Sequence, residues 1–223
     1  MRSHAVVQLA CLVGVVGLSG CAIWPWGGKE RTTVITPAMR VATIREIGPR
    51  ARDADEAQQT SMCQQLAQQI QTEPDPIVRK TIQETIAEFK TPLADAVILA
   101  GLKDDDRDVR LTSCRLLAKR ESVNVIGDLS LVAATDDDID VRMAAVDALG
   151  NFKSTDAVKG IAVGLKDRDP AMNFAAMNAM KGASGEDLGN DVQAWRQYAS
   201  RVTGVSDSAT AVAARPDDES TIK

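Results

Sequence analysis

Apolar and small residues recur along this chain at helical spacing, and the same spacing returns in four successive blocks of sequence. In each block they stand three, six and seven positions after one polar residue, which places them on a single face of a helix. The sets are Ile82, Thr85 and Ile86; Ser113, Leu116 and Leu117; Ala145, Ala148 and Leu149; and Ala176, Ala179 and Met180. The pattern predicts amphipathic helices that approach other helices closely.

A short string opens each of these helices. It reads Asp-Pro-Ile-Val-Arg, Asp-Arg-Asp-Val-Arg, Asp-Ile-Asp-Val-Arg and Asp-Pro-Ala-Met-Asn, and its first residue recurs at offsets of 31, 32 and 31. Asp is a favoured helix N-cap, and proline is tolerated at the first helical position. We therefore predict N-caps at Asp75, Asp106, Asp138 and Asp169.

A second helix follows in each block, and the ends of these helices align. They read Leu-Ala-Gly-Leu-Lys-Asp at 99–104, Leu-Val-Ala-Ala-Thr-Asp at 131–136 and Ala-Val-Gly-Leu-Lys-Asp at 162–167. Gly150 follows one of the first helices, where a C′ glycine is expected. A helix pair of this size cannot bury its apolar face alone, so the blocks are predicted to stack as a repeat array.

The Asp-x-x-Val-Arg openings and the run Val-Arg-Met-Ala-Ala-Val-Asp-Ala-Leu-Gly at 141–150 resemble HEAT-like repeats, which also occur in phycobilisome lyases. A weaker copy begins at Thr36, with its second helix expected over roughly 55–72. The resemblance implies an all-α, right-handed α-solenoid of about five helical hairpins over residues 36–203. It also implies protein interaction, without naming a partner.

The end of this array is predicted to be a capping helix over 186–202, because Leu188, Val192, Trp195 and Tyr198 share a helical face. Trp195 is interpreted as a core residue, with a ligand platform as the alternative. Residues 204–223 are small, polar and acidic without an apolar period, which predicts a disordered tail.

The N-terminus has the features of a lipoprotein signal peptide over residues 1–20. A charged start and an apolar run of about twelve residues precede Leu18-Ser19-Gly20-Cys21, which resembles the bacterial lipobox. This predicts cleavage between Gly20 and Cys21 and acylation of Cys21. Residues 21–35 would then be a lipid-anchored linker, in which Trp24 and Trp26 could lie among the lipid headgroups. An uncleaved anchor helix through Trp24 is the alternative.

The acidic strings at 104–108 and 136–140 place Asp at the first, third and fifth positions of a calcium loop, but the required Gly and Glu are missing. Carboxylates at a helix N-terminus explain them without a metal. Arg79, Arg110 and Arg142 recur once per block. We interpret them as a structural ladder that pairs with Asp of the same or the next block, and a row of guanidinium groups that binds an anion is the alternative.

Little in the composition supports catalysis. The one histidine is His4, which would leave with the signal peptide, and no phosphate-binding loop is present. We predict no catalytic residue, no metal and no cofactor. Cys63 and Cys114 could pair in an oxidising compartment, but their positions favour buried small hydrophobes. The net charge of −5, with scattered cations, argues against nucleic-acid binding.

Together these observations predict a lipoprotein in the cell envelope of a diderm bacterium. It would be anchored in a membrane through acylated Cys21, would face the periplasm, and would act as a scaffold for an unknown protein partner. Two alternatives remain open: a carrier of a small apolar ligand held between helices, and a lyase-like enzyme.

Overall fold

Helices are the only regular structure in residues 35–120 and 123–204, which are the residues that the computed structural model describes. The predicted signal peptide, residues 21–34 of the linker and the tail from residue 205 lie outside these ranges. The first helices of the blocks are α1 (Pro37–Arg45), α4 (Pro76–Ile86), α6 (Arg107–Leu117), α8 (Ile139–Leu149) and α10 (Pro170–Ser184). The second helices are α3 (Glu56–Thr72), α5 (Pro92–Ala100), α7 (Ile126–Thr135), α9 (Thr155–Ala162) and α11 (Val192–Thr203). Shorter elements are α2 (Ile47–Asp53) and the 3₁₀ helices η1 (Gly101–Lys103), η2 (Val123–Val125) and η3 (Gly164–Lys166).

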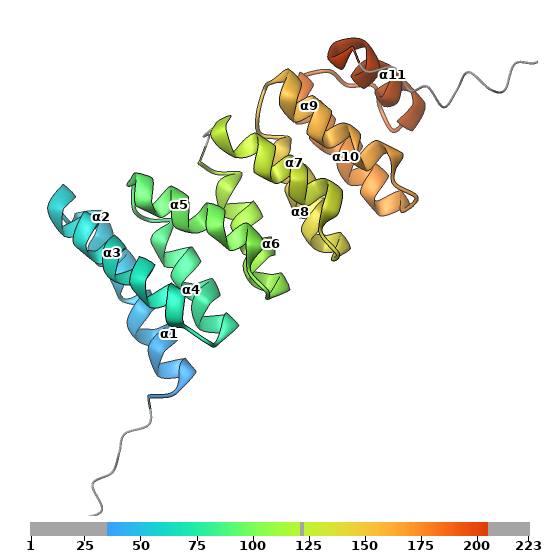
Figure 1. Cartoon of the computed structure of the whole chain (residues 1–223). Coiled ribbons are helices and arrows are strands. Elements are labelled where there is room, and N and C mark those ends of the chain that lie inside the picture. The colour runs from blue at the N-terminus through green and yellow to red at the C-terminus, as the bar shows by residue number, and fades with distance from the viewer. Residues whose placement is uncertain (1–34, 121–122, 205–223) are drawn as a thin grey trace, which may run out of the picture. The chain divides into compact units, whose positions relative to one another are not determined.

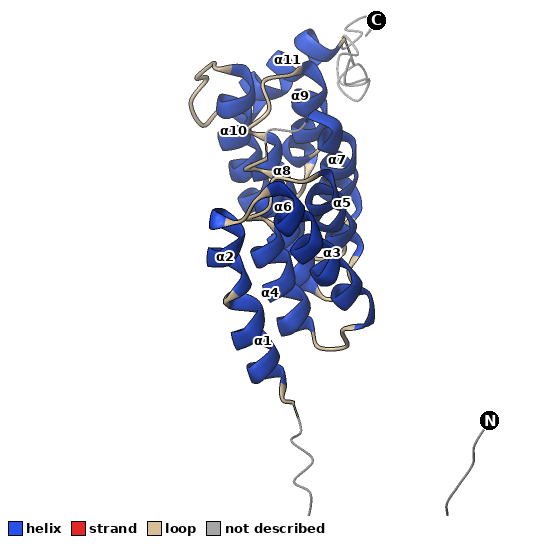
Figure 2. Cartoon of the chain, turned by 90° about the vertical axis from the view of Figure 1, so that its left-hand side faces the viewer, coloured by secondary structure: helices blue, strands red, loops and turns tan. Residues whose placement is uncertain are grey.

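The helices form two layers that run the length of the array. In the first layer α1 packs on α4, α4 on α6, α6 on α8 and α8 on α10 (Figure 1). Helices α3, α5, α7 and α9 form the second layer beside it, as Figure 2 shows. Helix α11 packs against α9, η3 and α10 at the C-terminal end. The prediction of an all-α solenoid is therefore confirmed, and its right-handed turn stays a prediction.

The two ends of the array differ from the regular repeat. The first block contains an extra break, because Glu46 ends α1 and begins α2. At the other end the predicted capping helix is present as α11, but it begins later than the predicted range of 186–202. Helix α10 ends at Gly185, whose φ of 77° is left-handed, and α11 begins only after its N-cap Asp191. Leu188 thus lies in the connecting loop, although it still packs against the core.

The core is aliphatic and lies between the two layers. Fully buried side chains include Ile82, Leu117, Leu149 and Ile161. Trp195 is also fully buried, and its indole Nε1 donates to the Gly189 carbonyl at 2.9 Å. Its position is that of a core residue that closes the last repeat, since a buried indole needs such a partner for its N–H group.

Close packing between α8 and α10 depends on two glycines. A Cβ on Gly182 would lie 2.4 Å from the Gly150 carbonyl oxygen, and a Cβ on Gly150 would lie 2.9 Å from the Ala179 Cα. Gly150 is not the left-handed C′ residue that the sequence predicted, because its φ is −59° and its ψ is −18°. The close approach of the two helices, rather than a special backbone conformation, explains why glycine stands there.

We expect Gly182→Ala to lower the free energy of unfolding by about 1–3 kcal/mol, because the methyl group would force the two backbones apart. Gly127 in α7 is the matched control, since a Cβ there meets nothing within 4 Å. Gly127→Ala should leave stability unchanged or raise it by up to about 1 kcal/mol through helix propensity. Urea unfolding of both variants measures the difference, and equal midpoints would contradict this packing.

Candidate functional site

The recurring arginines join consecutive repeats through paired hydrogen bonds. Arg79 donates through Nε and Nη2 to the two carboxylate oxygens of Asp104, at 2.8 and 2.7 Å. Arg110 does the same with Asp136, at 2.8 and 3.0 Å. In both pairs the carboxylate stands at the start of the loop that opens the next repeat. These contacts therefore fix one repeat against the next with the planar geometry of a bidentate pair.

The same two arginines also hold the chain just before their own helix. Nη1 of Arg79 donates to the carbonyls of Glu73 and Pro74, and Nη1 of Arg110 donates to those of Asp104 and Asp105. All three guanidinium nitrogens of each arginine are thus bound by protein acceptors. This arrangement is that of a structural ladder and leaves little donor capacity for an external anion.

The ladder weakens toward the C-terminal end of the array. Arg142 donates to the Asp136 carbonyl, but its Nη2 lies 3.7 Å from the Asp167 carboxylate. In the following repeat Asn173 donates only to the carbonyls of Asp167 and Asp169. At the N-terminal end the ladder continues instead, because Arg40 forms a bidentate pair with Glu73.

The leading aspartates stand at the N-caps of their helices. Asp75 accepts from the amide of Ile77, and Asp169 accepts from that of Ala171. Asp106 and Asp138 each accept from two amides of the first helical turn. Each cap satisfies amides that have no partner within the helix.

Burial and hydrogen bonding shift the pKa of the Asp104 carboxyl group in opposite directions. Partial burial alone raises the pKa of its carboxyl group, but the hydrogen bonds from Arg79 and from the Asp106 amide outweigh burial, so the pKa is lowered. The carboxylate of Asp104 is therefore already occupied by hydrogen bonds from Arg79 and from the Asp106 amide. Within residues 35–120 and 123–204 no group of three or more His, Cys, Asp or Glu side chains could hold a metal ion.

The cysteines in the described part of the chain are both buried and free. Cys63 places its Sγ 3.3 Å from the Thr91 hydroxyl. Burial raises the pKa of the Cys114 thiol to about 12, which keeps it protonated near neutral pH. Since the thiolate is the reactive form, Cys114 acts as a small core side chain. Cys63 is also fully buried in the core.

The surface that the sequence did not identify lies on the second-layer helices. One apolar residue is exposed near the end of each of α5, α7 and α9: Ala100, Leu131 and Val163, the C-cap of α9. Leu131 is 57% exposed and Val163 is 41% exposed, whereas their neighbours Leu99, Val132 and Ala162 are partly buried against the core. We call Ala100, Leu131 and Val163 the apolar ridge. The aligned ends of the second helices contain these apolar residues, but only the packed structure shows which side of each helix is exposed.

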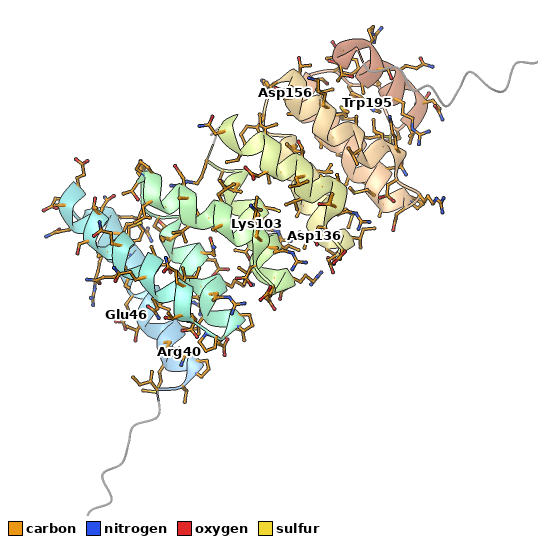
Figure 3. All side chains as sticks on the ribbon, in the orientation of Figure 1. Arg40, Glu46, Lys103, Asp136, Asp156 and Trp195 are labelled. Atoms are coloured by element: carbon orange, nitrogen blue, oxygen red, sulfur yellow. The ribbon has the colours of Figure 1, made fainter. Side chains whose placement is uncertain are left out.

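Two grooves adjoin the ridge. The first, which we call the acidic groove, has a volume of about 390 Å³ and lies between η1 and α7. Its rim includes Lys103 and Asp136, which are neighbours in Figure 3. The second, the basic groove, has a volume of about 240 Å³ and lies between α9 with η3 and α11. Its floor is apolar, with Ala162, Val163 and Ala199, and its rim carries Lys159, Lys166 and Arg196.

A family model for HEAT repeats matches residues 128–194 of this chain, which run from α7 to the start of α11. A comparison with curated proteins gave no match. Residues 128–194 are therefore similar to HEAT repeats, which generally mediate protein–protein interaction and typically serve as non-catalytic scaffolds. The match includes the central and C-terminal parts of the apolar ridge.

We expect Arg110→Ala to lower the free energy of unfolding by about 2–3 kcal/mol, because the Asp136 carboxylate, only 7% exposed, would lose its partner. Arg107 is the matched control. It pairs with Asp138 and Asp140 on the surface and is 44% exposed. Arg107→Ala should cost much less. Chemical denaturation compares the two, and an equal loss would show that the ladder adds nothing beyond surface charge pairing.

Proposed function

We propose that this protein is a lipoprotein of the bacterial cell envelope whose HEAT-like array holds a partner protein close to a membrane. The observation that carries the proposal is the apolar ridge on α5, α7 and α9. Two large apolar side chains, Leu131 and Val163, face water on neighbouring second-layer helices. Such a surface favours a protein-binding role, because burying apolar area against a partner is energetically favourable.

The shape of the surface supports a protein rather than a small apolar molecule as the ligand. The basic groove holds only about 240 Å³, below the range of roughly 300–1,000 Å³ common for small-ligand pockets. A third hollow of about 780 Å³, near the C-terminal end of α4, is lined mainly by charged side chains such as Glu84, Glu88 and Lys119. A carrier of an apolar ligand is therefore the weaker proposal. A lyase-like enzyme is weaker still, because in the described part of the chain both cysteines are buried and no His, Cys, Asp and Glu side chains group into a metal site.

Anchoring rests on the sequence of the N-terminal segment. Residues 1–34 lie outside the described part of the chain, and no helix among the described residues is long and apolar enough to cross a membrane. Cleavage after Gly20 and acylation of Cys21 would place two or three acyl chains next to Trp24 and Trp26. A single acyl chain binds a membrane only marginally, whereas two or more hold it firmly. The array would then face the periplasm at the end of the linker.

We expect the wild-type protein to incorporate labelled palmitate and to partition into the detergent phase. Cys21→Ser should abolish the label and leave a larger, unprocessed precursor, because cleavage follows diacylation of the thiol. Cys63→Ser, which changes a buried cysteine, should keep both the label and the processed mass. Intact-mass spectrometry and metabolic labelling measure these outcomes. An unlabelled wild type that retains residues 1–20 would favour the anchor helix instead.

Photo-crosslinking in intact cells tests the binding surface. A photoreactive residue at Leu131 should give a defined adduct with another protein, because this position lies at the centre of the apolar ridge. Phe174 on α10 is the matched control, since it is an apolar side chain of similar exposure, 53% against 57%. The same residue placed there should give no such adduct. Equal crosslinking from both positions, or none from Leu131, would contradict the proposed surface.

A further inference from the structure

The basic groove combines a cationic rim with an apolar floor. Arg196 donates through Nε and Nη2 to the Leu165 carbonyl at 2.8 and 2.6 Å, which holds its guanidinium at the rim without neutralising its charge. Lys159 pairs with Asp156, but that carboxylate is 75% exposed, so the pair is weak. None of the described residues that line the groove is acidic. The groove therefore favours an anionic segment that also carries small apolar side chains.

The chain leaves helix α11 beside this groove. Ser200 and Thr203 of α11 are among the lining residues, and Gly204 caps the helix with a left-handed φ of 69°. The Gly204 amide donates to the Ser200 carbonyl at 3.0 Å. A left-handed residue in this position ends the helix and redirects the chain. Gly204 thus places the start of the C-terminal segment at the wall of the groove.

The sequence after Gly204 has the composition that the groove favours. Residues 205–223 carry four carboxylates and two cations, and three of the carboxylates are consecutive at 217–219. The run Ala-Thr-Ala-Val-Ala-Ala at 209–214 precedes them and offers only small side chains. Small side chains suit a groove of about 240 Å³, which has little room for a bulky ligand. The segment therefore complements both the floor and the rim of the groove.

The segment is also long enough to reach the cations of the rim. Along α11 the groove runs from Arg196 to Thr203, which is about 10 Å at 1.5 Å per residue. The residues between Gly204 and Asp217 are 205–216, and an extended chain spans about 3.3 Å per residue. Even a strongly contracted path therefore brings Asp217 to the rim. A segment too polar to form a core of its own can still become ordered on a complementary surface.

We propose that residues 205–219 of this chain bind in its own basic groove. The small apolar run at 209–214 packs on Val163 and Ala199, and the three carboxylates at 217–219 lie at Lys159 and Lys166. The bound segment covers Val163, which belongs to the apolar ridge, and leaves Leu131 open. Binding needs no partner protein, so this inference goes beyond the proposed function and stands or fails independently of it.

Crosslinking within the full-length protein tests this inference. A photoreactive residue replaces Val212 in protein purified in detergent, and mass spectrometry locates the residues that it reaches. We expect the adduct to form with residues 159–166 or 196–203, which contain the lining of the groove. Isotope-labelled and unlabelled chains are mixed before illumination, so that an adduct within one chain is distinguished by mass from an adduct between two copies. We expect the adduct within one chain.

Charge reversal gives the matched control. Lys159→Glu combined with Lys166→Glu should reduce the adduct about fivefold, because it replaces an attraction at the rim by a repulsion. Lys153→Glu reverses an exposed lysine that does not line the groove, and it should leave the yield unchanged. Reversal of the three carboxylates at 217–219 to lysine should also reduce the adduct. Combining this reversal with the double variant of the groove should restore most of the yield, because the charges are again complementary.

Four results would overturn the inference: no adduct in the wild type, an adduct only between chains, an adduct confined to residues outside the groove, or a yield that survives both charge reversals. An equal loss in Lys153→Glu would overturn it as well, since net charge alone would then govern the contact. Reversal at 217–219 changes no residue of the array, so its effect is not a consequence of unfolding. Crosslinking from Leu131 in cells tests the proposed function separately, so either proposal can fail alone.

Discussion

The bidentate pair between an arginine of one repeat and an aspartate of the next loop is the contact on which the N-terminal and central repeats depend. A helical hairpin of this length exposes an apolar face that only its neighbour can cover, so the neighbour must stand at a defined height and angle. Arg79 with Asp104 and Arg110 with Asp136 fix both, because a planar guanidinium and a planar carboxylate accept few relative orientations. The aliphatic core then packs between surfaces that are already aligned.

The same pair explains why one short string could reveal the fold. Its aspartate caps a helix, its arginine reaches the next loop, and its valine enters the core, so three separate requirements recur at one spacing. The helix starts at Asp106 and Asp138 were therefore predictable from residue types alone. The exact partners of Arg79 and Arg110 were not, because pairing within a block and pairing with the next block have the same sequence pattern.

Other features could not be predicted from the sequence and were identified only from the packed structure. Gly150 sits where a left-handed residue often ends a helix, but its neighbour across the interface, Gly182, is 32 positions away, and a close contact at that separation leaves no local signal. The extent of the last helix was missed because Leu188 packs on the core from a loop, which produces a helical period without a helix. The exposed apolar positions could not be identified from the sequence for a similar reason. Leu131 and Leu129 both read as apolar in a helix, and only packing shows that one is buried and the other is exposed.

The decline of the ladder along the chain makes the array uneven. The N-terminal repeats are joined by charged pairs at Arg40, Arg79 and Arg110, whereas the last repeats meet through the close backbone approach at Gly150 and Gly182. Acid removes the charge of a carboxylate such as Asp104, whose pKa is lowered, despite burial, mainly by its hydrogen bond to Arg79, but does not alter methyl and backbone contacts. In a linear array each repeat contacts only its neighbours, so such a gradient allows the two ends to unfold under different conditions. Protonation of such a carboxylate at low pH would therefore loosen the N-terminal repeats first, while the end that carries the basic groove keeps its shape.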